Sequence, residues 1–266
     1  MTEQKEEKSC PVYKHAYFYG LGGAVATIRS VLTTPLTGVT PTLSSLHQNF
    51  VSSGVQNVIF EEIDGKVKEK MEEFNNPQEA WKIGVTAGVA IGTVNALVDS
   101  VFTNVYKHHA KRKEENPDVR CTFTSAVDLV SNKGITSLFD GYFSRAFSKS
   151  LFISTFKTSL WMNSKWIGNV FPNSTCPIKT RVIKPFIFGT VSGVQATLIS
   201  KPIDQIVKGM FSKEKIQPKK IVKNSICAAK VAGPSLGLTV ALYSNGVKYL
   251  KPSEIALKKL MTKFHK

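Results

Sequence analysis

KPFIFGTVSGVQATLISKPIDQIVKGM, residues 184–210, is the stretch from which the fold can be predicted. Small residues recur at every fourth position in it, at Gly189, Gly193 and Thr197, and Pro202 follows five positions later. Residues four apart lie on one face of a helix, so small ones form a flat stripe that lets a neighbouring backbone approach closely. Proline kinks or ends a helix because it removes a backbone hydrogen bond. The stretch therefore predicts a closely packed helix that bends or ends near Pro202.

Two further copies of this pattern appear when Pro35, Leu97 and Pro202 are superposed. The small residues thirteen, nine and five positions earlier are Gly22, Ala26 and Ser30 in the first copy, Gly84, Gly88 and Gly92 in the second, and Gly189, Gly193 and Thr197 in the third. Two positions after the superposed residue, the second and third copies carry an acid, Asp99 and Asp204. Three copies in one register predict an internal threefold repeat.

Each copy is followed by a second segment of helical character. After the middle copy, residues 132–134 end a short amphipathic helix, and Phe139-Asp140-Gly141 opens a long one. After the first copy, residues 54–56 lead into a helix with the sequence NVIFEEIDGKVK. After the third, residues 232–235 lead into LGLTVALYSNGVK. We therefore expect three pairs of helices, six in all.

Charged residues are distributed in a way that favours a membrane protein. The chain has 266 residues and a net charge of +16, yet 42% of its residues are apolar, which excludes a disordered basic tail. Residues 83–98, 185–200 and 231–247 carry no charge at all. A membrane-spanning helix needs about 20 mostly apolar residues. These runs are slightly short and rich in Gly, Ser and Thr, which fits helices packed around a polar interior. Hydropathy alone is also compatible with core helices of a soluble all-α protein. The internal threefold repeat favours the membrane protein.

These residues resemble the mitochondrial carrier family, in which three repeats form a six-helix barrel. The resemblance is strongest in KPIDQIVKGM (201–210) and NKGITSLFDGYFSRAF (132–147). It implies an all-α membrane protein with six transmembrane helices, arranged as three pseudo-threefold repeats of helix pairs. The division it implies is an N-terminal tail (1–12), a shortened repeat one (13–78), repeat two (79–176), a shortened repeat three (177–250) and a C-terminal amphipathic tail (251–266).

The resemblance also implies roles for the pattern residues. Helix kinks and close packing are expected at Pro35, Pro202, Gly22, Gly84, Gly88, Gly189 and Gly193. Lipid binding is expected at Gly141, although the position before it is the acidic Asp140 rather than the family's basic residue. The family carries Pro-x-Asp/Glu-x-x-Lys/Arg at its kinks, whereas this chain has Leu97 and Thr37 at two of those positions. The distance from Pro35 to position 97 is only 62 residues, so the first repeat is expected to lack its short surface helix.

Charged gates in the family close the barrel at its two ends. On the matrix side, Asp99 and Asp204 are retained, with Lys208 as the nearby cation. On the opposite side, Glu61 keeps the acid of the second gate and Lys165 keeps a base. A full network of six charges cannot form at either end.

Charges within a membrane span are costly and are therefore candidates for function. Arg29 interrupts the first apolar run, and Lys157 lies in the fourth helix. The family's central substrate contact on that helix corresponds to Ser148 and Lys149. These cations could hold a carboxylate or phosphate. The alternative is that the lysine side chains reach out to water, or that Arg29 caps a helix end.

The function implied is transport of a small anionic metabolite across the mitochondrial inner membrane by alternating access. The alternative is a transport-inactive scaffold or protein-interaction platform derived from a carrier, with the loss of gate charges in its favour. We expect a monomer in a cardiolipin-rich membrane. The outer mitochondrial membrane, a mitochondrion-related organelle and a peroxisome are the other locations considered.

Other function classes lack their sequence signals. The basic clusters at 107–113 and 213–223 contain no Phe, Trp or Tyr, which argues against nucleic-acid binding and fits a positive-inside bias. The chain has no Gly-rich phosphate loop, no nucleophile elbow and no metal spacing among its histidines and cysteines. We expect neither an enzyme nor a cofactor. The C-terminal sequence SEIALKKLMTKFHK, residues 253–266, predicts a short amphipathic helix on the membrane surface.

Overall fold

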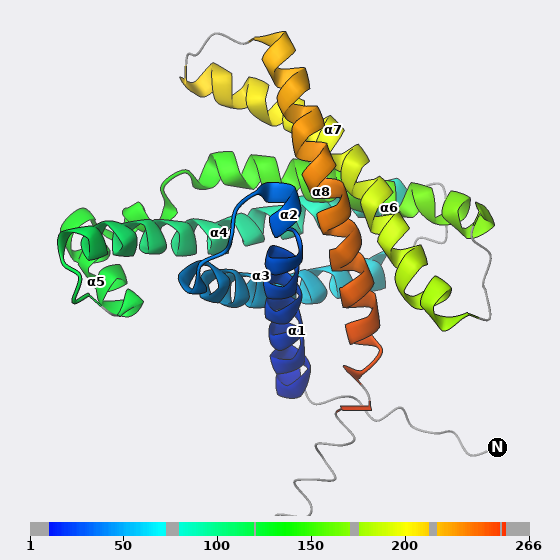
Figure 1. Ribbon diagram of the computed structural model, residues 1–266, viewed down its shortest axis with the longest axis horizontal. Coiled ribbons are helices and arrows are strands. Elements are labelled where there is room, and N and C mark those ends of the chain that lie inside the picture. The colour runs from blue at the N-terminus through cyan, green and yellow to red at the C-terminus, as the bar shows by residue number, and fades with distance from the viewer. Residues whose placement is uncertain are drawn as a thin grey trace, which may run out of the picture.

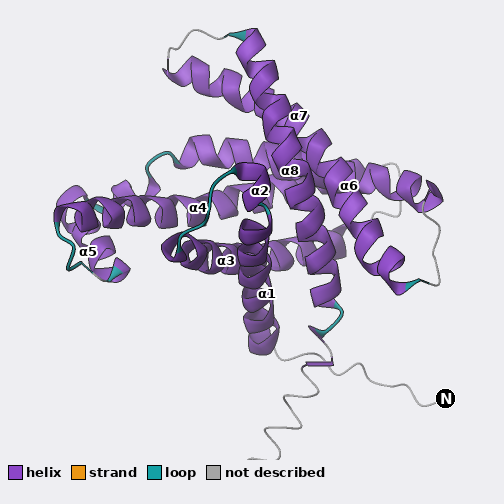
Figure 2. Ribbon diagram, in the orientation of Figure 1, coloured by secondary structure: helices purple, strands orange, loops and turns teal. Residues whose placement is uncertain are grey.

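The structure is a computed structural model that describes residues 11–72, 80–119, 121–170, 176–212, 217–250 and 252–253. In these residues all regular structure is helical, as the all-α prediction requires (Figure 2). The predicted C-terminal amphipathic helix lies outside them, as does most of the N-terminal tail.

The helices follow one another with short connections. They are α1 (Pro11–Leu32), α2 (Thr34–Thr37), α3 (Leu43–Glu72), α4 (Ala80–Glu115), α5 (Thr122–Lys133), η2 (Ile135–Phe139), α6 (Tyr142–Val170), η3 (Lys179–Ile183), α7 (Lys184–Ser212) and α8 (Pro218–Val247).

Six long helices form a closed ring in chain order. Helices α1, α3, α4, α6, α7 and α8 each contact the next, and α8 returns to α1. In Figure 1, α4 runs to the left with α6 returning beside it, and α7 runs upward with α8 returning downward. The ring closes where the Tyr17 hydroxyl donates a 2.6 Å hydrogen bond to the Gly246 carbonyl. The Phe18 and Tyr243 rings also stack there, with centroids 6.5 Å apart.

Three helical stretches are long and apolar enough to cross a membrane. They are Gly84–Glu115, Lys179–Val207 and Pro218–Val247, which belong to α4, to η3 with α7, and to α8. The helices α1, α3 and α6 are also long, at 22, 30 and 29 residues. They fall short in apolar character, since α3 and α6 carry several charged residues and α1 is polar at its start. Six spans therefore stay a prediction, whereas three candidate spans are observed.

The interior is polar and the exterior apolar, which is the arrangement expected in lipid. Val89 and Leu97 of α4 are 48% and 42% exposed, whereas Asn95 and Ser100 of the same helix are 6% and 0% exposed. In the described part of the chain, buried polar residues outnumber buried apolar ones. In water this distribution would leave a large apolar surface exposed. In a membrane it places the apolar side chains against lipid and the polar ones against each other.

The small-residue stripes face the second helix of each pair. A Cβ atom on Gly88 would overlap the backbone of Ser154 in α6, and one on Gly189 would lie 2.7 Å from the Leu236 carbonyl oxygen in α8. In the first pair, a Cβ on Gly22 would meet Asn57 of α3. Gly84 and Gly193 approach the second helix of their pair in the same way. Small residues are thus needed for helix contact in all three pairs.

Two predicted helix starts are wrong. The sequence predicts that helices begin just after Gly54 and just after Gly233-Pro234. In the structure, α3 and α8 begin earlier and run through both positions without interruption. Tertiary contact explains these glycines. A Cβ on Gly54 would lie 2.8 Å from the Tyr19 ring, and one on Gly233 would lie 2.6 Å from a methyl group of Val194.

The other helix boundaries follow the sequence closely. Helix α1 ends before Pro35, which lies in the first turn of α2, whereas α7 continues through Pro202 to Ser212, so the bend expected there stays a prediction. Helix α5 ends at Gly134, as predicted, and α6 begins after Gly141. Both glycines have a positive φ, of 79° and 75°, in a region that residues with a side chain rarely adopt. Between α1 and α3 the only helix is the four-residue α2, so this part of the described chain has no longer surface helix.

The close approach at Gly88 makes a testable prediction. Replacing Gly88 by Val should lower the free energy of unfolding by about 3 kcal/mol, because the added atoms would force α4 and α6 apart. The measurement is thermal unfolding of the purified protein in detergent, followed by tryptophan fluorescence.

The matched control is Gly65→Ala, because no atom lies within 4 Å of a Cβ there. That exchange should change the free energy by about 1 kcal/mol at most, and toward higher stability, since alanine favours a helix over glycine. Equal stability of the two variants would contradict the contact.

Candidate functional site

A cavity of about 250 Å³ lies inside the ring of helices. Its lining comes from α1, α3, α4 and α8. Helices α4 and α8 stand three places apart in the ring, so a space that both of them line lies across its interior. Most of the lining is neutral and polar or small: Gly22, Ala26, Ser53, Gln56, Asn57, Asn95, Thr239 and Tyr243. The lining surface is mostly apolar with a few hydrogen-bonding groups set into it, which is typical of a site for a small solute.

Arg29 is the one charged residue among the described residues that line this cavity. It lies near the end of α1, in the last turn before Leu32. Its guanidinium forms no ion pair and no side-chain hydrogen bond with any other described residue. A partly buried cation without an acid beside it favours an anionic ligand, because the ligand supplies the missing charge. The structure thus places this sequence-predicted residue in a cavity.

Asn95 provides a second unmet polar group in the same cavity. The residue is 6% exposed, and its side-chain oxygen Oδ1 has no hydrogen-bond partner among the described residues. A buried carbonyl oxygen without a donor costs free energy, which a bound donor would recover. The cavity therefore presents one cation and one buried acceptor.

Tyr243 forms one end of the cavity. Its hydroxyl donates a hydrogen bond to Glu61 Oε1 of α3, and its ring stacks on Phe18 of α1. The contact ties α8 to α3 across the inside of the ring. Glu61, expected as the acid of a gate, is thus paired with a hydroxyl rather than with a cation in the described contacts.

Lys157 is paired rather than free for substrate. Its ammonium group Nζ contacts Asp64 Oδ1 of α3, and both side chains are mostly buried, at 14% and 12% exposed. The same Nζ lies 4.5 Å from the centre of the Phe60 ring, a cation–π distance. Lys157 therefore links α6 to α3 in this structure.

Lys149 and Ser148 contact the two acids expected in the matrix-side gate. Lys149 Nζ lies 3.5 Å from Asp99 Oδ1, which joins α6 to α4. The Ser148 hydroxyl donates to Asp204 Oδ1 and so joins α6 to α7. Lys201 Nζ also lies 3.8 Å from Asp204 Oδ2. Lys208 of α7 was the cation expected in this gate, and Lys165 of α6 was the base expected in the opposite gate with Glu61. The side chains of both lysines lie outside the described part.

The polar contacts form two layers within the ring. Lys149 and Lys157 are eight residues apart on α6, a separation of about 12 Å along a helix. One layer contains Lys149 with Asp99 and Ser148 with Asp204, and the other contains Lys157 with Asp64 and Tyr243 with Glu61. Ser148 with Asp204, Lys157 with Asp64 and Tyr243 with Glu61 join helices of different pairs, whereas Lys149 with Asp99 lies within the α4 and α6 pair.

The sequence missed the neutral residues of the site. Asn95 and Tyr243 lie in the uncharged runs that are predicted to be spanning helices. Gln56 lies in residues 54–56, which are predicted to precede a helix. A search for charges does not find them. The available signal was the presence of an asparagine within an otherwise apolar run, where an amide needs a partner.

Known proteins do not identify this chain. Comparison with protein-family models and with curated proteins gives no match. The described part of the chain is all-helical and has three candidate membrane-spanning helices. Only the chain's own residues indicate its function beyond that.

The ion pair between Lys149 and Asp99 can be tested with a double-mutant cycle. Each single exchange to Ala leaves the other charge without a partner, whereas the double exchange removes both. Since the two side chains are 27% and 32% exposed, we expect a coupling free energy of about 1–2 kcal/mol.

The measurement is unfolding of the four proteins in detergent under the same conditions. Lys149→Ala combined with Asp140→Ala serves as the control cycle, because no contact joins those two side chains in the described structure. A coupling near zero for Lys149 and Asp99 would contradict a stabilising pair.

Proposed function

We propose that this protein transports a small anionic metabolite across a membrane by alternating access. The observation that carries the proposal is the position of Arg29, a cation without a described partner in a cavity inside a ring of helices. A soluble binding protein would not expose long apolar helix faces, and this chain has three stretches that suit a membrane. A scaffold would have no need of an unneutralised arginine within its interior.

The two polar layers supply a mechanism for alternating access. Opening of one end would separate Ser148 of α6 from Asp204 of α7, while the contact of Lys149 with Asp99 within the α4 and α6 pair is kept and the other layer stays closed. Opening of the other end would separate Lys157 from Asp64 and Tyr243 from Glu61. A bound anion neutralises Arg29 and lowers the cost of enclosing that charge away from water while both ends are closed. Exchange between the two states is then favoured when substrate occupies the cavity.

We also propose six spans, a divergent carrier-like arrangement and the mitochondrial inner membrane. Support comes from the threefold repeat, from the ring of six long helices and from the likeness of residues 132–147 and 201–210 to carrier signatures. The basic clusters suit an anionic membrane such as one rich in cardiolipin. Gly141 is the proposed lipid contact, and the protein is proposed to act as a monomer.

A specific observation favours a second function, that of a transport-inactive scaffold. Two of the three cations expected to hold substrate, Lys149 and Lys157, are neutralised by Asp99 and Asp64. Both layers of polar contacts are also present together, which describes a closed ring. A carrier-derived protein that binds partners through its outer surface would keep such a ring permanently closed.

Arg29 gives the decisive test between the two functions. Purified protein in liposomes should take up one or more members of a panel of carboxylates, inorganic phosphate, amino acids and nucleotides. The variant Arg29→Gln should lower that uptake about 10–100-fold, because a charge-assisted hydrogen bond in the cavity is lost.

Lys113→Gln is the matched control, since it removes one positive charge from the exposed end of α4 and should leave uptake unchanged. Arg29→Gln with full uptake would remove Arg29 from the site. Absence of uptake by the natural protein across the whole panel would favour the scaffold.

The number of spans can be counted from the two ends of the chain. Six spans place both ends on one side of the membrane, whereas three place them on opposite sides. In a variant with Cys121, Cys176 and Cys227 changed to Ser, the remaining Cys10 reports the side of the N-terminal end. A second variant carries these three changes together with Cys10→Ser and Lys266→Cys, so that its single cysteine reports the side of the C-terminal end. An impermeant maleimide should label both ends from the same side of sealed vesicles. Labelling from opposite sides would overturn the six-span arrangement.

A further inference from the structure

A second pocket lies outside the ring, where α4 extends beyond its apolar part. It has a volume of about 210 Å³ and is lined by α4, α5, η2 and the residue after η2. We propose that this pocket binds a phosphate group, carried either by free phosphate or by the headgroup of a membrane lipid. The proposal is independent of transport, because the pocket shares no residue with the cavity that contains Arg29.

Three lysines converge on this pocket from two helices. Lys107 and Lys111 lie one turn apart on α4, and Lys133 is the last residue of α5. Like charges one turn apart on a helix repel each other. Lys107 and Lys133 form no ion pair with any other described residue. Lys111 has an acid nearby, at 3.7 Å, but this is the exposed Glu115 one turn further along the helix.

The one acid that lines the pocket does not balance these charges. Asp140 is exposed and contributes a single negative charge, so the lining keeps a surplus of two positive charges. A phosphate monoester carries about 1.5 to 2 negative charges at neutral pH, whereas a carboxylate carries one. The charge of the pocket therefore fits a phosphate better than a carboxylate.

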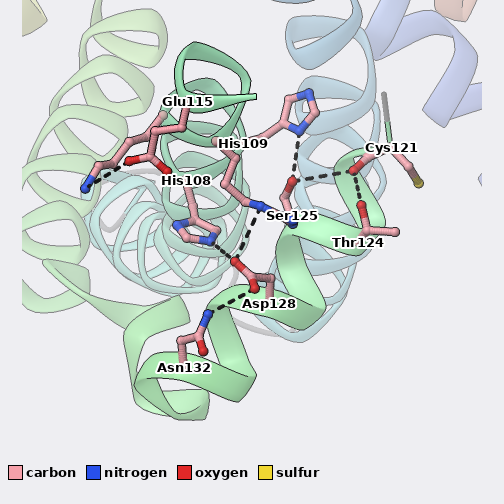
Figure 3. A network of polar contacts seen from close by, with 10 residues as sticks. His108, His109, Glu115, Cys121, Thr124, Ser125, Asp128 and Asn132 are labelled. Carbon is pink, nitrogen blue, oxygen red and sulfur yellow. Dashed lines mark hydrogen bonds and ion pairs between the residues drawn. The ribbon is translucent and has the colours of Figure 1, made fainter. Parts of the chain in front are cut away.

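A network of polar contacts fixes the two helices that carry the lysines, α4 and α5. Figure 3 shows the carboxylate of Asp128 at its centre. His108 Nε2 lies 2.7 Å from Asp128 Oδ2, Arg112 Nε lies 3.5 Å from the same oxygen, and Asn132 donates a 3.0 Å hydrogen bond to Oδ1. His109 adds a 2.9 Å contact with the hydroxyl of the fully buried Ser125. These contacts fix α5 on α4.

Asp128 is occupied by this network and is not available to the lysines. The hydrogen bond from His108 is the largest influence on Asp128, and it holds the pKa of the carboxyl below its ordinary value. The carboxylate is thus charged at neutral pH and already has three partners. Another support comes from the η2 side, where Asn104 donates to the carbonyl oxygens of Leu138 and Asp140 at 3.0 and 3.1 Å. The pocket is therefore shaped before any ligand binds.

The pocket lies where it can meet either a lipid headgroup or free phosphate. Lys107 and Lys111 belong to the charged last part of α4, beyond the uncharged run that ends at residue 98. In a protein that spans the membrane with α4, this part lies near the lipid headgroups and the water beside them. Free phosphate and the monoester phosphate of a lipid such as phosphatidic acid share the charge and the chemistry that ammonium groups recognise.

The test measures binding of two probes to the full-length protein in detergent. One probe is inorganic phosphate, and the other is dioctanoyl phosphatidic acid, with dioctanoyl phosphatidylcholine, a zwitterionic phosphodiester without net charge, as the control. Binding is followed by the rise in unfolding temperature and by titration calorimetry. We expect at least one of the two phosphate probes to bind, and Lys107→Gln with Lys133→Gln to weaken that binding at least tenfold. Binding of the lipid alone assigns a headgroup, and binding of both probes assigns the phosphate group itself.

Two further variants separate the site from a general effect of charge or folding. Lys113→Gln with Lys248→Gln removes two exposed charges outside the pocket and should leave binding unchanged. Asp140→Asn removes the competing carboxylate and should tighten binding several-fold, a gain that a misfolded protein could not produce. The proposal is overturned if the natural protein binds neither probe, or if the pocket double variant binds as tightly as its control.

Discussion

Contact between helix backbones is the constraint on which the rest of this structure depends. At Gly88 and Gly92, α4 lies directly against the backbone of Ser154 and Ser150 in α6, with no side chain between them. Because the two helices approach so closely, short polar side chains and lysines on α6 reach residues of other helices. Lys149 of α6, for example, reaches Asp99 of α4. The same kind of contact recurs between α1 and α3 and between α7 and α8, so the ring is built from three similar pairs.

A polar interior follows from this architecture and has an energetic cost. In lipid, each buried polar group needs a partner within the protein, because no water is present to replace it. Most of the interior charges meet this need in pairs, such as Lys157 with Asp64. Arg29 and the carbonyl oxygen of Asn95 have no such partner among the described residues, and both line the same cavity. The buried hydroxyls of Ser100, Thr158 and Thr190 also lack a partner within the described part of the chain, but they do not line that cavity. A cation and an unpaired acceptor in one cavity give a bound ligand two groups from which it gains free energy.

The two proposed anion sites use different means to attract charge. In the cavity, a single guanidinium lies among neutral side chains, some of which can form hydrogen bonds, and this suits a small anion. At the end of α4, several flexible ammonium groups surround an exposed pocket, and a network centred on Asp128 only positions them. A compound with one negative charge fits the first site, and a phosphate fits the second. The same chain could thus be sensitive to two different anions.

The sequence by itself determined the helical class, the small-residue stripes and the boundaries at Gly134 and Gly141, because these depend on neighbours along the chain. It also marked Arg29, since one charge in an apolar run is visible without a structure. Only the tertiary structure decided that Lys149 and Lys157 are paired, that Asn95 and Tyr243 belong to the cavity, and that Gly54 and Gly233 serve contact rather than a helix break. These features depend on which helix lies opposite, and residue spacing along one helix does not determine its neighbour.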